Sequence, residues 1–388
     1  MGRSIFSPGG PGSELLRKFR VVLVRLPAPG HNRRMTHRRA RTILAFLLAL
    51  PLTVAMTAAA TAPQGTVRPD GGGHHAGPRY APYFETWTKD QLPAVARASG
   101  ARDLTLAFLQ TPKKGSCSLT WNGSAKQPVK PGGRYTAQIK TLRAMGGEAT
   151  PSFGGYSADQ DGTEIADSCR SVPAIARAYE SVITTYGVTR LDMDVEANSL
   201  NNQAGIARRS AALRLLQDWA ARTHHRVRIT FTLGVEPWGL PGNCLAILKS
   251  AVADGVRFSV NIMAFDYYIK ASKTGIEMGT AAIQALYGTH RQLGRLYPGV
   301  SRPRLWALEG ITLLPGIDDY PKKTEVTYLS DTRKVAGFAR AHRLPLVSIW
   351  AIQRDNGGCP GTIDSNSCSG IRQARWAFSH LIEGYAGW

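Results

Sequence analysis

The apolar and polar positions of residues 79–388 repeat in a strand-then-helix order. Short apolar runs predict eight strands, and amphipathic stretches with apolar positions three and four residues apart predict helices between them. The clearest helical stretches are 134–147, 172–187 and 332–343, and the first two end in glycine, as helices with a left-handed cap do. The predicted strands are Arg79–Glu85, Asp103–Gln110, Glu148–Phe153, Thr189–Glu196, Arg226–Leu233, Phe258–Phe265, Arg304–Thr312 and Pro345–Ile352.

Eight strands that each precede a helix favour an α/β fold, a (β/α)₈ TIM barrel, over a doubly wound open sheet, which is the alternative. The chain of 388 residues is 43% hydrophobic and 19% charged, which is enough for one large core. Residues 79–388 contain no repeat and no sign of a second domain. We therefore expect a single barrel over this range.

The region before the barrel has the pattern of an export signal. Three arginines precede the apolar run Ile43–Met56, and small residues up to Ala62 follow it. This predicts a secretory signal peptide over 35–62, with twin-arginine export as the alternative to the general route. Residues 1–34 show no fold pattern and are interpreted as an over-long start, and 63–78 as a flexible Gly/Pro-rich leader. We expect a secreted, extracellular protein with no membrane segment after cleavage.

The net charge of +21 falls to about +12 without residues 1–62, which carry ten Lys/Arg and one acid. Nucleic-acid binders concentrate cations in runs or along one helix, interleaved with aromatic residues. Here the cations scatter over many predicted helices. The charge therefore indicates a solvated surface suited to anionic surroundings rather than a nucleic-acid site, and nothing indicates an oligomer, so a monomer is expected.

The five cysteines become disulfide candidates if the chain is exported. Cys359 and Cys368 lie in one polar loop whose ends can meet, Cys117 and Cys169 lie in other polar loops, and Cys244 lies in a predicted helix. The sequence alone leaves the connectivity open. Metal ligation is the weaker alternative because no CxxC or nearby pair of histidines accompanies them.

The predicted fourth strand carries three acids in strict alternation, in the stretch "LDMDVE". Asp192, Asp194 and Glu196 share one face, and apolar residues occupy the other. In a barrel this face points inward, so repulsion and burial raise at least one carboxyl pKa and make Glu196, at the open end, a general acid. A metal site is the alternative, but Asp266 is the one further clear oxygen ligand, and we expect neither a metal nor a cofactor.

Four motifs in strand order resemble glycoside hydrolase family 18, the chitinases and their relatives. "LDMDVE" resembles the DxxDxDxE signature, "SFGG" (152–155) the SxGG strand, "NIMAFDYY" (261–268) the Met-x-Tyr-Asp strand, and "SIWAIQRD" (348–355) the eighth strand. The resemblance extends from about Tyr80 to the C-terminus. The stretches "GITLLPGIDD" and "RDNGGCPG" also resemble secreted chitinases of the actinobacterial kind.

The resemblance implies a substrate-assisted, retaining hydrolysis of chitin or other N-acetylglucosamine glycans. Glu196 would be the general acid and base, Asp194 would orient the substrate's acetamido group, and Asp192 would share a proton with Asp194. The implied sugar contacts are Asp266, Trp350, Tyr83, Tyr267 and Met263, with Trp87 and Trp238 as weaker candidates for outer subsites.

The remaining motif residues are expected to be structural. Ser152, Gly154 and Gly155 would shape the barrel, and Arg354 and Asp355 would form a pair near its rim.

The sequence departs from the family pattern at two positions. Thr189 replaces the first Asp of DxxDxDxE, at the deep end of the strand. Phe265 replaces the Tyr before the sixth-strand Asp, which removes a hydroxyl that would hold the acetamido oxygen; Tyr267 or Tyr268 could supply one. The loss of one donor to developing charge lowers a rate by about a hundredfold.

Two other functions are compatible with the same motifs. One is a non-catalytic chitin- or glycan-binding barrel, although such proteins typically lose the acid that Glu196 provides here. The other is an endo-β-N-acetylglucosaminidase that acts on N-glycans.

Overall fold

The computed structural model describes residues 78–267, 277–319, 325–363 and 366–386, which belong to one unit spanning Pro63–Trp388. A curled parallel sheet lies at its centre, in the order β1-β12-β9-β8-β7-β6-β5-β3-β2, and β4 pairs antiparallel with β3. The strands are β1 (Arg79–Tyr80), β2 (Tyr83–Glu85), β3 (Leu104–Gln110), β4 (Thr120–Trp121), β5 (Ala149–Gly154), β6 (Arg190–Val195), β7 (Arg228–Gly234), β8 (Ser259–Met263), β9 (Glu309–Leu313), β10 (Gly316–Ile317), β11 (Val326–Thr327) and β12 (Leu346–Ile349).

The sheet closes through the first predicted strand, which is divided into β1 and β2. β1 pairs in parallel with β12, whereas β2 pairs in parallel with β3 at the other end of the strand order. Pro82 lies between the two pieces and has no backbone N–H to donate, although its carbonyl accepts a hydrogen bond from Thr105. Because one continuous segment joins both ends of the sheet, the sheet is a closed barrel, and the predicted (β/α)₈ fold is confirmed.

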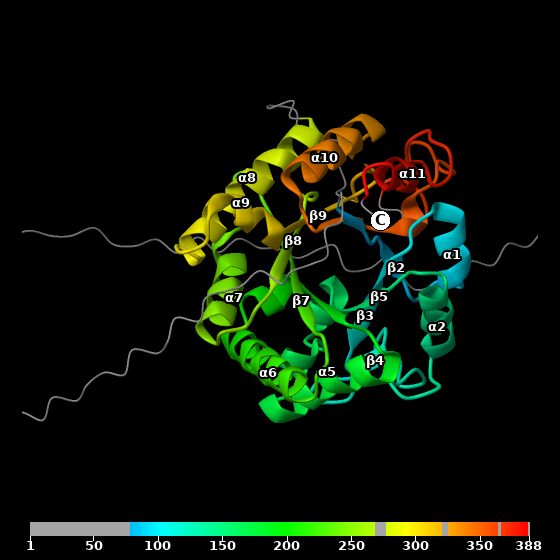
Figure 1. The fold of residues 1–388 in the computed structure, drawn as a ribbon. Coiled ribbons are helices and arrows are strands. Elements are labelled where there is room, and N and C mark those ends of the chain that lie inside the picture. The colour runs from blue at the N-terminus through cyan, green and yellow to red at the C-terminus, as the bar shows by residue number, and fades with distance from the viewer. Residues whose placement is uncertain (1–77, 268–276, 320–324, 364–365, 387–388) are drawn as a thin grey trace, which may run out of the picture. The chain divides into compact units, whose positions relative to one another are not determined.

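The helices surround this barrel, as the view in Figure 1 shows. They are α1 (Leu92–Ser99), α2 (Thr136–Ala144), α3 (Tyr156–Asp161), α4 (Ile165–Ser168), α5 (Val172–Tyr186), α6 (Gln203–Arg222), α7 (Gly242–Ala253), α8 (Met278–Leu296), α9 (Arg302–Leu305), α10 (Leu329–His342) and α11 (Ala377–Glu383), with 3₁₀ turns η1 (Ala197–Leu200), η3 (Trp306–Leu308) and η4 (Ile352–Arg354).

The core lies between the barrel and its helices. Leu191, Met193 and Val195 on β6 are buried in it, which confirms that the apolar face of this strand points outward from the barrel. On β5, Phe153 packs edge-to-face against Tyr179 of α5, with ring centroids 5.1 Å apart. Full burial of one such side chain contributes about 1.5–3 kcal/mol, so these contacts set which face of each strand points inward.

The predicted strand Arg304–Thr312 is wrong over its first half. Residues 302–308 form α9 and η3, and the strand β9 begins at Glu309. Pro303 lies in the first turn of α9, where its fixed φ favours a helix and its missing N–H costs nothing. The apolar residues that followed it were mistaken for a buried strand because a short apolar run has no distinctive period.

Two disulfides join Cys117 to Cys169 and Cys359 to Cys368, and Cys244 is a buried free thiol. The cysteine candidates are therefore confirmed, and the connectivity that the sequence left open is now resolved. The predicted signal peptide, the over-long start and nearly all of the leader lie outside the described residues. Within the described ranges, no helix combines the length and apolarity needed to cross a membrane.

Candidate active site

The three acids of β6 point into the barrel in the order that the alternation predicts. Asp192 and Asp194 lie within the strand and are buried, with 3% and 2% of their surfaces exposed. Glu196 follows the strand as the residue before η1 and is half-buried. The observed strand therefore ends at Val195, one residue before the predicted end at Glu196. The three acids, which we call the acid row, extend from the barrel interior to its open carboxyl end.

Asp192 is surrounded by hydroxyl donors from three other strands. Its carboxylate accepts hydrogen bonds from Tyr83 Oη at 2.9 Å, Ser152 Oγ at 2.6 Å and Thr232 Oγ1 at 2.7 Å. Burial raises the pKa of Asp192, and these three hydroxyls oppose that rise because they stabilise its charged form. Ser152, which we expected only to shape the barrel, thus belongs to the polar interior of the site.

Asp194 has less support for its charge. Its Oδ1 is buried without a hydrogen-bond partner, and burial, Glu196 and Asp192 together raise its pKa well above the usual range. Among the described contacts, none is a hydrogen bond between Asp192 and Asp194. A proton shared by these two residues stays a prediction.

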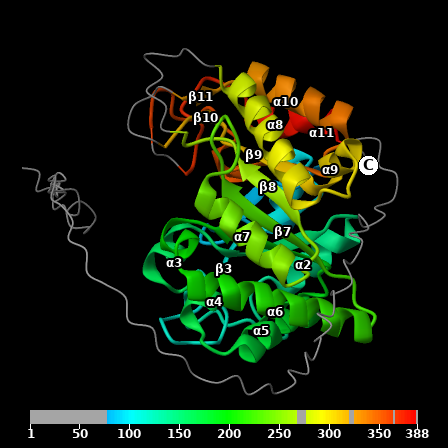
Figure 2. The same cartoon turned by 90° about the vertical axis from the view of Figure 1, so that its left-hand side faces the viewer.

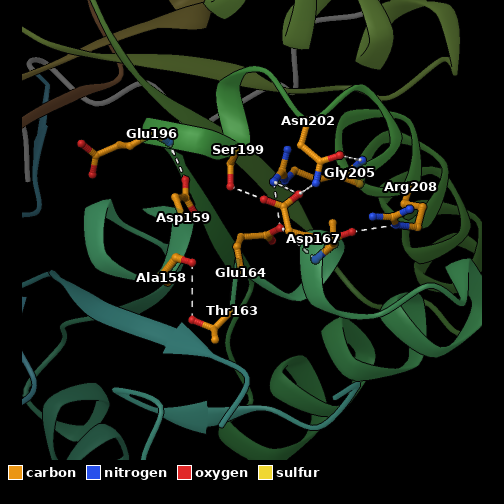
Figure 3. Close-up of polar contacts among 12 residues, drawn as sticks. Ala158, Asp159, Thr163, Glu164, Asp167, Glu196, Ser199, Asn202, Gly205 and Arg208 are labelled. Carbon is orange, nitrogen blue, oxygen red and sulfur yellow. Dashed lines mark hydrogen bonds and ion pairs between the residues drawn. The ribbon is translucent and has the colours of Figure 1, made fainter. Parts of the chain in front are cut away.

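Burial raises the pKa of Glu196 to about 7, and the charge of Asp319 contributes to the rise, while a hydrogen bond from the backbone of Tyr156 opposes it. A carboxyl group with this pKa is partly protonated at neutral pH, as a general acid must be. The backbone N–H of Glu196 donates to Asp159 Oδ2 at 2.5 Å, and Figure 3 shows Asp159 pointing toward this backbone. Asp159 lies on α3 and is completely buried.

A separate buried polar network adjoins the turn that follows Glu196 (Figure 3). Arg209 of α6 forms an ion pair with Glu164 at 2.8 Å, and both side chains are 1% exposed. Asp167 accepts hydrogen bonds from Ser199 in η1 and from Asn202, at 2.9 Å for the latter, just before α6. This network ties the turn after β6 to α4 and α6, so the position of Glu196 is fixed from below.

An aromatic surface lies beside the acid row. The rings of Phe108 and Trp350 stack with centroids 5.5 Å apart, and Tyr83 contacts Trp350 edge-on at 5.4 Å. Trp87 stacks on Phe108 and is 46% exposed, so it extends this surface toward solvent. Tyr83 is itself buried, and its described polar contacts are with the barrel interior. Trp238 follows β7, is exposed, and has no ring contact with this surface among the described residues.

The two glycines of "SFGG" allow these parts to approach one another. Gly154 has φ 94°, and a Cβ there would lie 2.2 Å from the backbone oxygen of Asp194. Gly155 has φ 79°, and a Cβ there would lie 2.5 Å from the ring of Phe108. Both positions require glycine, for conformation and for space. Their expected role in shaping the barrel agrees with this geometry.

A second carboxyl cluster, formed by Asp266, Asp318 and Asp319, follows β8 and β9. One oxygen from each lies within 4.8 Å of the others. Burial and hydrogen bonds to the other two raise the pKa of Asp266 to about 10, so Asp266 is neutral at neutral pH. The cluster could hold a divalent cation; within the protein its carboxyl groups hydrogen-bond to one another, and the charge of Arg354 lies nearby.

The other predicted sugar contacts lie near this cluster. Met263 is the last residue of β8 and is half-buried. Tyr267 is 3% exposed, and its hydroxyl is buried without a hydrogen-bond partner. Tyr268 lies outside the described residues.

The expected pair of Arg354 and Asp355 does not form. Arg354 donates to the carbonyls of Ile317 at 2.5 Å and Pro315 at 3.4 Å, whereas Asp355 accepts from the backbone N–H groups of Phe378 and Ser379. Adjacent residues on a turn point in different directions, so neighbours in sequence are not neighbours in space. Arg354 therefore anchors the backbone around β10, whereas Asp355 accepts from the first turn of α11.

Asp159, Thr232, Phe108 and the Asp318–Asp319 pair escaped the sequence reading. Phe108 and Thr232 do lie on predicted strands, and "GIDD" was noted as a motif, but no periodic pattern marks Asp159. Its role arises from a contact between residues 37 positions apart in the chain.

A closed parallel barrel with buried carboxyl groups at the carboxyl ends of its strands, next to exposed aromatic rings, defines a site of the glycoside hydrolase class. Comparisons with known proteins agree. The chain is 32% identical over 314 residues to a probable bifunctional chitinase/lysozyme of Escherichia coli (strain K12), covering 78% of this chain and 34% of that protein. It is 32% identical over 284 residues to endochitinase 11 of Metarhizium anisopliae, covering 71% of this chain and 52% of that protein.

Solved structures extend the similarity to the fold. Active domain 2 of a chitinase from Pyrococcus furiosus, solved as catalytic-site mutants, matches with 27% identity and a TM-score of 0.67 over 81% of this chain and 97% of that chain. A family GH18 chitinase from Cycas revoluta shares the fold at 10% identity and a TM-score of 0.50 over 79% of this chain and 99% of that chain.

No protein-family model matches the chain. The sequence and structural similarities nevertheless support a glycoside hydrolase of family 18, as the four motifs predicted. The chain spans about a third and about a half of the lengths of the two curated relatives, 34% and 52%.

Proposed function

We propose that the chain is a secreted chitinase that hydrolyses β-1,4 bonds between N-acetylglucosamine units. The observation that carries this proposal is the row Asp192–Asp194–Glu196, in which Asp192 accepts three hydroxyl hydrogen bonds and burial raises the pKa of Glu196 to about 7, beside the aromatic surface of Phe108 and Trp350. Aromatic rings suit the apolar faces of sugars, and a carboxyl group with a raised pKa suits the protonation of a leaving oxygen. The names of the relatives, which are chitinases, agree with this substrate class.

In the proposed reaction, Glu196 donates its proton to the glycosidic oxygen as the bond to the anomeric carbon breaks. The substrate's own acetamido oxygen forms a new bond to that carbon and gives a cyclic oxazolinium ion. Water then attacks the same carbon, the bond from that carbon to the acetamido oxygen breaks, and the water gives a proton to the Glu196 carboxylate, which restores the acetamido group and the enzyme and retains the configuration. The hydroxyl donors around Asp192 and the raised pKa of Glu196 support this division of labour.

Asp194 and Asp266 are the proposed partners of the acetamido group. Asp194 Oδ1 is buried and unpartnered, so it can accept the acetamido N–H. Asp266 Oδ1 is also unpartnered, and the raised pKa of Asp266 makes it a neutral donor to the acetamido oxygen. This donor, with the free hydroxyl of Tyr267, would replace the hydroxyl that Phe265 lacks. Trp350 would support the sugar, and Met263 would contact it.

The experiment incubates the purified protein with chitin oligosaccharides and, separately, with N-glycoproteins, and identifies the products by mass spectrometry. We expect chitin fragments, loss of hydrolysis in Glu196→Gln with retained binding, and full activity in the control Glu180→Gln on the outer helix α5. Release of N-glycans alone would favour an endo-β-N-acetylglucosaminidase. Binding without any product would favour a non-catalytic glycan-binding barrel and refute the enzymatic proposal.

Secretion, the monomeric state and the relation to actinobacterial chitinases are parts of the same proposal. The signal pattern of residues 35–62 supports export, and so do the two disulfides, which form in oxidising compartments. N-terminal sequencing of the exported protein would test the cleavage near Ala62. A mature protein that still carries residues 35–62 would contradict it.

A further inference from the structure

A groove of about 1860 Å³ lies outside the proposed active site, between α8, α9 and the end of α10. Its lining is basic, and we call it the arginine groove. Five arginines from two separate stretches of the chain converge in it: Arg291, Arg295, Arg302, Arg304 and Arg343. The scattered cations that the sequence suggested are therefore concentrated here by the fold.

The charges of these arginines are not neutralised within the protein. All five side chains are exposed, and none takes part in an ion pair or a side-chain hydrogen bond among the described residues. No Asp or Glu lines the groove. Glu309, which contacts the lining residue His290 at 2.7 Å, is itself 1% exposed and cannot face a ligand. The groove thus presents five unpaired guanidinium groups on a concave surface.

The floor of the groove is rigid and aromatic but largely covered. Trp306 stacks on His290 with ring centroids 3.8 Å apart and contacts His342 at 4.8 Å. Trp306 is 8% exposed, whereas Tyr287 is 43% exposed and is the one aromatic residue of the lining that offers an open face. Single-stranded nucleic acids bind to rows of exposed rings on which successive bases stack. The groove offers cations without such a row.

The groove lies at the end of the barrel opposite the acid row. α9 and η3 directly precede β9, and Arg343 precedes β12, so the groove residues lie near the amino ends of these strands. Figure 2 shows α9 and the β10–β11 pair, which follows β9, at opposite ends of the barrel. A ligand in the groove would leave the carboxyl ends, where Glu196 lies, open to substrate.

We infer that the arginine groove binds a phosphate-rich polyanion that lacks aromatic bases, such as inorganic polyphosphate or a poly(glycerol phosphate) polymer. Guanidinium groups bind phosphate oxygens in pairs with fixed geometry and keep their charge at all working pH values. Several such contacts along one concave surface select an extended polymer over a single phosphate. This activity is separate from hydrolysis and does not depend on the proposed function.

The experiment measures binding of the folded protein to fluorescent polyphosphate, to poly(glycerol phosphate) and to single-stranded DNA of matched charge, over a range of salt concentrations. The test variant combines Arg291→Gln, Arg302→Gln and Arg304→Gln. Each lost phosphate contact lowers the slope of log affinity against log salt by about 1, so we expect a slope smaller by about 3 and binding at least ~10-fold weaker at low salt. Comparison of the two phosphate polymers identifies the source of the ligand.

The control variant carries the same loss of charge elsewhere. It combines changes to glutamine at three exposed arginines that form no described ion pair, Arg226, Arg257 and Arg372. We expect it to bind polyphosphate as the parent does, and both triple variants to keep the parent's melting temperature and its activity on neutral chitin oligosaccharides.

Three results would overturn the inference. One is the absence of saturable binding to either phosphate polymer. Another is an equal loss of affinity in the control variant, which would indicate general attraction to a basic protein. The third is tighter binding of single-stranded DNA than of the phosphate polymers, which would assign the groove to nucleic acid. Because hydrolysis is measured on neutral substrate, failure here is distinguishable from failure of the proposed function.

Discussion

Asp159 provides a test of how the fold positions Glu196, the proposed general acid. It lies on α3, far from the acid row in sequence, and its Oδ2 accepts the backbone N–H of Glu196 at 2.5 Å. Burial and the charge of Glu164 raise the pKa of Asp159 well above its usual range, which disfavours its charged form. Its effect on catalysis should therefore depend on geometry more than on charge.

The variant Asp159→Ala removes this acceptor and leaves the N–H of Glu196 unsatisfied. A buried donor without a partner costs about 1–3 kcal/mol of folding stability. The turn after β6 would shift, and a misplacement of about 1 Å at a catalytic group lowers the rate by roughly a hundredfold. We expect kcat to fall ~10- to 100-fold and KM to change little, because the residue has no described contact with the aromatic surface.

The variant Asp159→Asn keeps an oxygen that accepts the same N–H. We expect it to retain kcat within about threefold, since an amide oxygen can accept the hydrogen bond in the position of the carboxyl oxygen. Asp161→Ala, an exposed position on the same helix, is the matched control and should have no effect. The assay is steady-state kinetics on chitin oligosaccharides together with a melting temperature for each variant.

Two results would contradict this reasoning. If folded Asp159→Ala kept the parent kcat, the hydrogen bond would have no part in positioning Glu196. If Asp159→Asn lost as much activity as Asp159→Ala, the charge of the carboxylate, and not its geometry, would be the important property. The pH profile of kcat/KM separates the two explanations, because a charge effect would displace the limb that Glu196 sets.

Further predictions concern pH, hydrogen bonding and the disulfides. Because the pKa of Glu196 is raised to about 7 and the proposed acid acts in its protonated form, kcat/KM should fall as pH rises above about 7. Asp319→Asn removes a repelling charge and should move this fall to lower pH. An unchanged pH profile in this variant would show that Asp319 does not affect the pKa of Glu196. Tyr83→Phe removes one hydroxyl donor from Asp192, the deepest carboxylate of the row. It should lower the free energy of unfolding in urea by about 1 kcal/mol and kcat by ~10-fold. A variant with unchanged stability and kcat would show that this hydrogen bond is dispensable. The chain-entropy model gives a contribution to the free energy of unfolding of about 4 kcal/mol for the Cys117–Cys169 disulfide, whose cysteines are 52 residues apart, and about 2.6 kcal/mol for Cys359–Cys368, which are 9 apart. Replacing the cysteines of each pair by serine should lower the stability measured by urea unfolding in this order. The reverse order would contradict an entropic origin.

The sequence by itself determined the barrel, the acid row and the set of paired cysteines. Strict alternation on β6 fixed which residues face inward, because successive side chains of a strand point to opposite sides. The order of strands and helices restricted the fold, because parallel strands need crossover connections. The predicted start of a strand at Arg304 was wrong, because a short apolar run fits a strand and a helix equally well.

Only the tertiary structure decided which distant residues meet. It placed Asp159 under Glu196, gathered Asp318 and Asp319 beside Asp266, and separated Arg354 from its chain neighbour. It also collected arginines from two stretches into one groove, although they had no common pattern along the chain. The periodicity of apolar residues indicates which face of each strand or helix is buried. The contacts between distant elements depend instead on how loops and helix ends pack once the barrel has closed. The proposed general acid could therefore be found in the sequence, but the residues that hold it in place could not.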